Sequence, residues 1–281
     1  MIDLSPLFNL DPLLLLGLCL LGLFTGFVAG LFGIGGGMVM VPFIVYFLSL
    51  IDINQDLVLK IAIATSMSTI VFTSLSSVKA HHKKGAVRWE LVKGLAPGLI
   101  IGSLISSAGM FSLFKGTTLA LVFEGFLYYS ATQMYINKKP KPSRQVPDAL
   151  GMVGAGGVIG FFSGLVGAGG GFISVPFMVW CNVELRNAVA TSAALGFPIA
   201  LTNVIGYIYS GWSELGRPAL SLGFIWIPGM ILIAVCSVLT APLGVKVAHK
   251  LPVKYLSKIF AGLLYTLATY MLYKTVTQLL N

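Results

Sequence analysis

The chain has 281 residues, of which 57% are hydrophobic and only 10% are charged. Soluble domains carry about 25% charged residues, so this composition excludes an ordinary soluble domain and indicates a membrane protein. The formal net charge of +9 does not indicate nucleic-acid binding, because the cations lie in short loops between apolar segments, where positive charge marks the cytoplasmic side of a membrane protein. The first residues lack the positive stretch of a signal peptide, so the run from Pro12 is expected to be the first membrane helix.

Two short segments interrupt a regular series of apolar stretches. A helix that crosses a bilayer needs about 20 residues, and the segments 37–50 and 171–182 are shorter. Each directly follows a triple glycine, so we expect each to form a glycine-broken helical hairpin with the segment before it. The expected series is 12–32, 37–50, 57–78, 91–112 and 117–136 in the first half, and 149–168, 171–182, 187–210, 220–243 and 256–276 in the second.

The same glycine-rich motif occurs once in each half. The stretches GFVAGLFGIGGGMVMVPF at 26–43 and GFFSGLVGAGGGFISVPF at 160–177 agree at every glycine and in the closing Val-Pro-Phe. Further on, residues 60–66 align with 186–192, and both end in Ala-Thr-Ser. We interpret this as a two-fold internal duplication. The predicted units are a first membrane repeat at 1–137, a linker at 138–148 and a second membrane repeat at 149–281.

The charged loops of the two halves are opposite in pattern. Loop 79–93 contains five Lys and Arg residues, whereas its counterpart around 211–219 contains one. Later the asymmetry reverses, because 246–258 contains four lysines and its counterpart 113–116 contains one. With positive loops in the cytoplasm, equivalent loops face opposite sides. We therefore predict an all-α polytopic membrane protein of two inverted-topology repeats, each of about five hydrophobic segments, with both termini outside the cytoplasm and the linker inside it.

The triple glycines are the first candidate for a binding site. A helix that begins after such a loop presents free N–H groups and partial positive charge, to which an anion binds without a charged side chain. Two such loops brought together by a pseudo-two-fold axis would form one central anion site. Close helix packing explains the glycines spaced four apart (Gly26, Gly30, Gly160 and Gly164), but it explains triple glycines poorly. The backbone candidates are Gly33, Gly35, Gly36, Gly37, Gly167, Gly169, Gly170 and Gly171.

Hydroxyl groups follow each glycine loop at the same distance along the chain. Thr65, Ser66, Thr191 and Ser192 close the two Ala-Thr-Ser blocks and are able to donate hydrogen bonds to an oxyanion. Hydrogen bonds between helices are the equally weighted alternative. Asn203, further along the second of these helices, is a candidate amide donor.

Three ionisable residues are candidates for weaker roles. Lys60 and Arg186 begin equivalent helices, where they would attract an anion into a vestibule; snorkelling to the membrane boundary is the favoured alternative. Glu124 lies inside an apolar segment, where an ionisable group is costly and by default functional. It is a candidate carrier of a coupling proton. The alternatives are pairing with a loop lysine or contact with a water-filled crevice.

The paired G-x-G-G-G-x-x-x-V-P-F blocks, each followed by Ala-Thr-Ser, resemble those of the sulfite exporter TauE/SafE family of membrane permeases. The blocks run from 33 to 43 and from 167 to 177, and the resemblance extends over about 12–276. It implies a protein of the bacterial or archaeal inner membrane that transports sulfite, sulfoacetate or other organosulfonates. Export is the usual direction, with protons as the expected coupling ion. The residues themselves indicate only an anion.

We therefore expect a secondary transporter that works by alternating access around a central site, with a passive anion channel as the alternative. A cation or metal transporter would need acidic or sulfur ligands within the membrane, and a membrane enzyme would need a catalytic cluster, for which His81 and His82 are the only hint. We expect no catalytic residue, metal site, cofactor or nucleic-acid partner. The expected partners are a small anionic substrate, H+ and the lipid bilayer.

Overall fold

The computed structural model describes residues 11–50, 53–136, 144–250 and 253–280, and the side chains of 253–255 are not among them. Helices dominate these residues, and two short strands form one hairpin. The first six residues of the predicted linker 138–148 lie outside the described residues. The elements are α2 (Pro12–Phe32), α3 (Gly37–Leu48), α4 (Gln55–His82), α5 (Trp89–Leu104), the π-helical turn η1 (Ile105–Met110), α6 (Gly116–Ile136), α7 (Ala149–Val166), α8 (Gly171–Trp180), α9 (Leu185–Ser210), β1 (Ser221–Leu222), β2 (Ile225–Trp226), α10 (Ile227–Lys250) and α11 (Val253–Leu280).

Seven helical stretches in the described part of the chain are long and apolar enough to cross a membrane. They are α2, α4, α5 with η1, α7, α9, α10 and α11. The prediction of an all-α polytopic membrane protein is confirmed. Helix α6 has the necessary length of 21 residues but is less apolar, because it carries hydroxyl side chains and Glu124.

Two predicted boundaries were wrong. The segment expected at 220–243 begins with the β1–β2 hairpin, and its helix runs from Ile227 to Lys250; Gly223, with φ at 58°, makes the turn between the two strands. Helix α4 continues to His82, so the start of the predicted 79–93 loop is helical. His81 is consequently buried, and its Nδ1 lies 3.4 Å from Nε2 of His249 on α10.

Each of the short helices α3 and α8 follows a glycine turn. Gly33 ends α2 with φ at 67°, and Gly167 ends α7 with φ at 68°. Gly36 and Gly170 precede α3 and α8 with φ at 75° and 76°. Residues with side chains rarely adopt this left-handed conformation, so these positions need glycine. The sequence folds into two helical hairpins at the expected places.

Each hairpin packs against a helix of the other half of the chain. Helix α2 lies along α10, and α7 lies along α5. A Cβ atom on Gly26 or Gly30 would collide with carbonyl oxygens of α10, and one on Gly160 would collide with a carbonyl oxygen of α5. The glycines spaced four apart therefore allow close helix packing, as in other membrane bundles.

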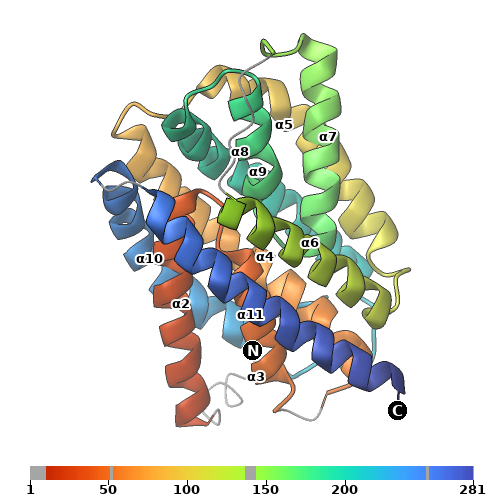
Figure 1. The fold of residues 1–281 in the computed structure, drawn as a ribbon. Helices are drawn as coiled ribbons and strands as arrows, with labels where there is room; N and C mark the ends of the chain where they lie inside the picture. Colours follow the sequence, from red (N-terminus) through yellow and green to blue (C-terminus); the bar gives the residue numbers. More distant parts are fainter. Residues whose placement is uncertain (1–10, 51–52, 137–143, 251–252, 281) are drawn as a thin grey trace, which may run out of the picture.

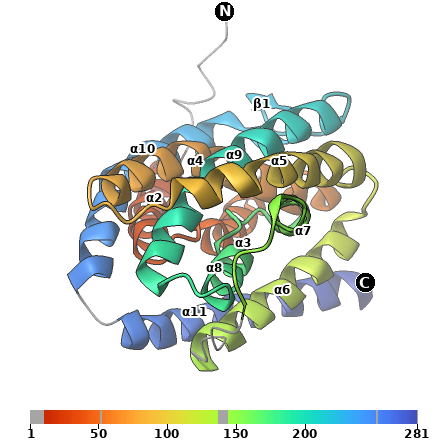
Figure 2. The same cartoon turned by 90° about the horizontal axis from the view of Figure 1, so that it is seen from above.

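The two hairpins extend in opposite directions from the centre of the molecule. In Figure 1, α2 and α3 lie toward the bottom, whereas α7 and α8 lie toward the top. Seen from above in Figure 2, the hairpins lie between a row formed by α10, α4, α9 and α5 and the pair α6 and α11. This arrangement buries both glycine loops inside the protein.

Candidate functional site

The two glycine loops touch each other. A Cβ atom built on Gly35 would lie 3.3 Å from the Cα of Gly169, and one built on Gly169 would lie 3.3 Å from the Cα of Gly35. The first residues of α3 and α8 likewise face the carbonyl oxygens of Gly167 and Gly33. The structure therefore brings the predicted backbone candidates together, so closely that side chains would force the loops apart.

The two Ala-Thr-Ser serines bind the glycine loops of the opposite halves. Ser192 Oγ donates a hydrogen bond to the carbonyl of Gly33 at 3.0 Å, and Ser66 Oγ donates to the carbonyl of Gly167 at 3.4 Å. Ser174 Oγ on α8 donates in turn to Ser192 Oγ at 2.9 Å. Ser66 and Ser192 thus each link one half to the other, and Ser174 is a participant that the sequence did not single out.

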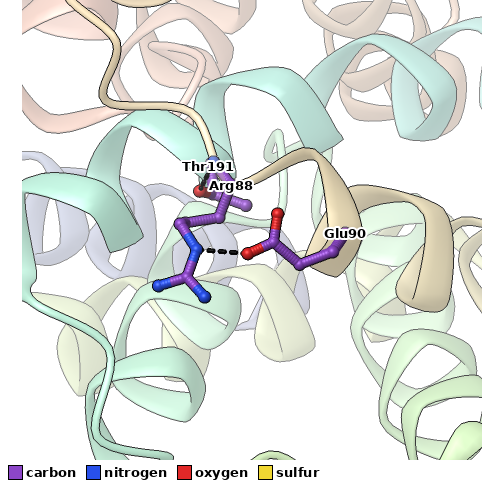
Figure 3. Close-up of polar contacts among 3 residues, drawn as sticks. All are labelled: Arg88, Glu90 and Thr191. Carbon is purple, nitrogen blue, oxygen red and sulfur yellow. Dashed lines mark hydrogen bonds and ion pairs between the residues drawn. The ribbon is translucent and has the colours of Figure 1, made fainter.

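The two threonines bind backbone N–H groups of the opposite halves. Thr65 Oγ1 accepts a hydrogen bond from the N–H of Trp226, which precedes α10, at 3.0 Å. Thr191 Oγ1 accepts from the N–H of Arg88, which precedes α5, also at 3.0 Å. Figure 3 shows Thr191 beside the backbone of Arg88, whose guanidinium is directed away toward Glu90. In this conformation the four predicted hydroxyls connect helices, as the alternative interpretation expected.

Asn203 and the two predicted vestibule cations lie in three different environments. Asn203 is fully buried; its Nδ2 donates to the carbonyl of Ile199 at 2.9 Å, and its Oδ1 has no hydrogen-bond partner among the described residues. Lys60 is only 6% exposed and donates to the carbonyl of Ser112 at 3.1 Å. Arg186 is exposed.

Glu124 joins the pair of helices α6 and α11. Its side chain is 1% exposed, and Oε1 accepts a hydrogen bond from Thr275 Oγ1 at 2.6 Å. Oε2 has no hydrogen-bond partner in the described part of the chain. No lysine pairs with it there, since the only salt bridge found among those residues joins Arg88 and Glu90. The described residues also contain no group of three or more His, Cys, Asp or Glu able to hold a metal ion.

A small cavity lies beside the first glycine loop. Its volume, measured to the centre of a water-sized sphere, is about 10 Å³, which is close to the minimum for one water molecule. Sequence reasoning missed its three hydroxyl residues on α4, although they lie 7, 8 and 11 residues after Ser66, which places them on the same helical face two and three turns further on. The lining residues are Ala29, Gly33, Gly35, Thr73, Ser74, Ser77, Ala193 and Gly196.

Comparison with known proteins gives a consistent result. The family model described as "Sulfite exporter TauE/SafE" matches residues 18–271. A "probable membrane transporter protein" of Haemophilus influenzae is 37% identical over 259 residues, which cover 92% of this chain and 98% of that protein. A protein with the same description from Methanocaldococcus jannaschii is 27% identical, and the match covers 92% of this chain and 96% of that protein. Another from Bacillus subtilis is 30% identical, and the match covers 69% of this chain and 78% of that protein. No solved structure matches the chain.

Proposed function

Because the chain belongs to the sulfite exporter TauE/SafE family of membrane transporters, we propose that it carries a small sulfur-containing anion across the cell membrane. The proposed substrates are sulfite, sulfoacetate or another organosulfonate. The proposed mode is proton-coupled export by alternating access around a central site. A passive anion channel is the alternative, because it would use the same glycine-broken helices without a coupling ion.

The contact between the two glycine loops carries this proposal. No side chain caps the first N–H groups of α3 or α8, so backbone donors at both helix starts remain available to a ligand. The partial positive charge of a helix start favours an anion there. Non-helical backbone within a membrane is tolerated only where it is buried in protein or lines a water-filled cavity. A site of this kind attracts an anion without placing a cationic side chain in the membrane.

Reciprocal contacts support two inverted repeats as the frame of the transporter. The bond from Ser66 to the second glycine loop has its counterpart in the bond from Ser192 to the first. The bond between Thr65 and the residue before α10 has its counterpart in the bond between Thr191 and the residue before α5. Such symmetry allows the protein to exchange two equivalent arrangements by rocking one half against the other.

The serine bonds suggest how substrate binding and movement are coupled. Both hydroxyls now donate to loop carbonyls, and a buried hydroxyl that loses its acceptor is costly unless another takes its place. We propose that an oxygen of the anion replaces the carbonyl of Gly33 as the partner of Ser192 when the loops separate. The substrate then stabilises the open arrangement, and its absence favours the closed one.

Glu124 is the proposed carrier of the coupling proton. A buried carboxyl group inside a membrane helix marks a functional site by default, and one of its oxygens has no partner among the described residues. Its equivalent in the second half is Ala261, which does not ionise. Proton uptake would therefore act on one repeat only and would give the movement a direction.

Transport into proteoliposomes tests the proposal. The purified protein is reconstituted and given isotopically labelled sulfite or sulfoacetate with an imposed pH gradient. A proton-coupled transporter accumulates the label above equilibrium and loses it when an uncoupler is added, whereas a channel equilibrates the label and stops. Flux equal to that of protein-free liposomes for every sulfur anion tested would contradict the proposal.

A further inference from the structure

The two glycine loops have different surroundings, although their sequences match. The cavity beside the first loop, which we call the α4 pocket, is walled by the end of α2, the second half of α4 and the first half of α9. No side chain in its wall is larger than threonine. The space is therefore a consequence of small residues at these positions.

Large residues occupy the equivalent positions beside the second loop. The alignment of the two Ala-Thr-Ser helices continues without a gap, so Thr73 corresponds to Ile199 and Gly196 corresponds to Ile70. Both isoleucines are fully buried. A Cβ atom on Gly170 of the second loop would lie 2.6 Å from the Cδ1 of Ile199. The duplicated backbone thus has room for a ligand beside one loop, and aliphatic side chains pack at the equivalent place beside the other.

Ser77 gives the α4 pocket an unused hydrogen-bond donor. Its side chain is 2% exposed, and its Oγ has no hydrogen-bond partner among the described residues. The other two hydroxyls of the wall are engaged, because Thr73 pairs with Ser237 and Ser74 donates to the carbonyl of Val71. A buried hydroxyl without a partner is costly and calls for a ligand or a water molecule.

The end of α4 beyond the pocket has basic neighbours. His81, one helical turn after Ser77, is buried next to His249. Arg186 and Lys84 lie close enough to His249 to act on it electrostatically. Cations near a recessed site raise the local concentration of anions.

We propose that the α4 pocket holds the oxyanion group of the substrate and that Ser77 Oγ donates a hydrogen bond to one of its oxygens. The inference rests on the proposed function and places the anion on one side of the loop contact instead of symmetrically between the loops. In this structure the pocket has room for about one water molecule, so an anion enters only when the first loop moves away from Ala193 and Gly196. The small walls select a compact oxyanion of the size of sulfite over a bulky sulfonate.

Calorimetric titration of the full-length protein with sulfite, in oxygen-free buffer, tests this assignment. Ser77→Ala should weaken sulfite binding about 10- to 100-fold, because the lost hydrogen bond is to a charged group. Ala193→Met, which introduces the residue found at the equivalent position 67, should remove measurable binding. Ser130→Ala is the matched control: Ser130 is also buried with an unpartnered Oγ, but it lies on α6, outside the pocket. The affinity of the Ser130→Ala variant for sulfite should stay within about twofold of that of the unsubstituted protein.

Thermal unfolding without ligand separates a binding role from a structural role. Ser77→Ala should leave the melting temperature unchanged or raised, because the deleted hydroxyl has no partner; a hydroxyl with a structural bond would lower it. Unchanged sulfite affinity in Ser77→Ala would overturn the α4 pocket and leave the proposed function standing if the original chain binds and transports sulfite. Absence of binding and of transport of every sulfur anion by the original chain would overturn both.

Discussion

The two glycine loops share the conformation of their first and last glycines and differ at the middle glycine, where Gly35 is left-handed and Gly169 is not, and in their side-chain surroundings. Both turns use left-handed glycines with φ values between 67° and 76°, and both are held by a serine of the opposite half. Small and hydroxyl-bearing residues line a cavity at the first loop, whereas Ile199 packs against Gly170 of the second. The comparison teaches that matching glycine turns do not require matching side chains around them, and the side chains decide on which side a cavity remains.

The largest expected effect comes from changing the shared backbone. Gly36→Val and Gly170→Val should each reduce transport to background, because both positions have φ near 75°, which a β-branched residue avoids. Size-exclusion profiles and uptake assays should show folded but inactive protein in both cases. Full transport by both variants would show that the loops are not part of the site.

Glu124 tests a difference between the halves that lies outside the glycine loops, because its equivalent in the second half is Ala261. Glu124→Gln keeps the shape of the side chain and removes its ionisation. We expect uphill accumulation of the anion to disappear, while exchange of labelled for unlabelled substrate across the membrane continues. Accumulation equal to that of the original chain would exclude Glu124 as the proton carrier; loss of exchange together with accumulation would indicate a structural role.

Packing around the second loop should contribute more to stability than the wall of the α4 pocket. Ile199→Ala removes a fully buried side chain that packs against Gly170 and should destabilise the fold by about 2–5 kcal/mol, as other large-to-small core changes do. Ser74→Ala, on the pocket wall, should cost about 1 kcal/mol or less. The melting temperatures of the two variants test this prediction. Equal losses of stability in both variants would contradict the expected difference between the second loop and the wall of the α4 pocket.

The smallest expected effect distinguishes the two loop serines. Ser192→Ala should cost about 1–2 kcal/mol, because it breaks the 3.0 Å bond to Gly33 and removes the acceptor of Ser174. Ser66→Ala should cost roughly half as much, since it breaks a single 3.4 Å bond. The melting temperatures of the two variants test this order. A larger loss of stability in Ser66→Ala than in Ser192→Ala would contradict it.

The helices and the hairpins could be predicted because hydrophobic length and glycine breaks are local properties of the sequence. The paired glycine loops could be predicted because the motif repeats. The partners of Thr65 and Thr191 could not, since the acceptor role of a hydroxyl depends on which backbone the fold brings beside it. The contact of the Lys60 ammonium with the ring of Phe224 could not be predicted either, because no local pattern shows a tertiary contact of that kind.

Some properties of Ser77 could be predicted from the sequence, and others could be found only in the structure. Its spacing from Ser66 and Ser74 places it on the same face of α4, and its alignment with Asn203 marks two polar residues at equivalent depth. Those relations could be found in the sequence. Only the structure shows that its hydroxyl has no partner among the described residues, because this depends on the neighbours that α2 and α9 bring beside it.

The most direct measurement is an anomalous-scattering structure of the protein with selenite, which has the charge and shape of sulfite and a heavier central atom. We expect one selenium peak inside the protein, beside the first glycine loop and within hydrogen-bond distance of Ser77 Oγ. A peak confined to the exposed lysines and arginines, or an empty interior at a selenite concentration that inhibits transport, would contradict it.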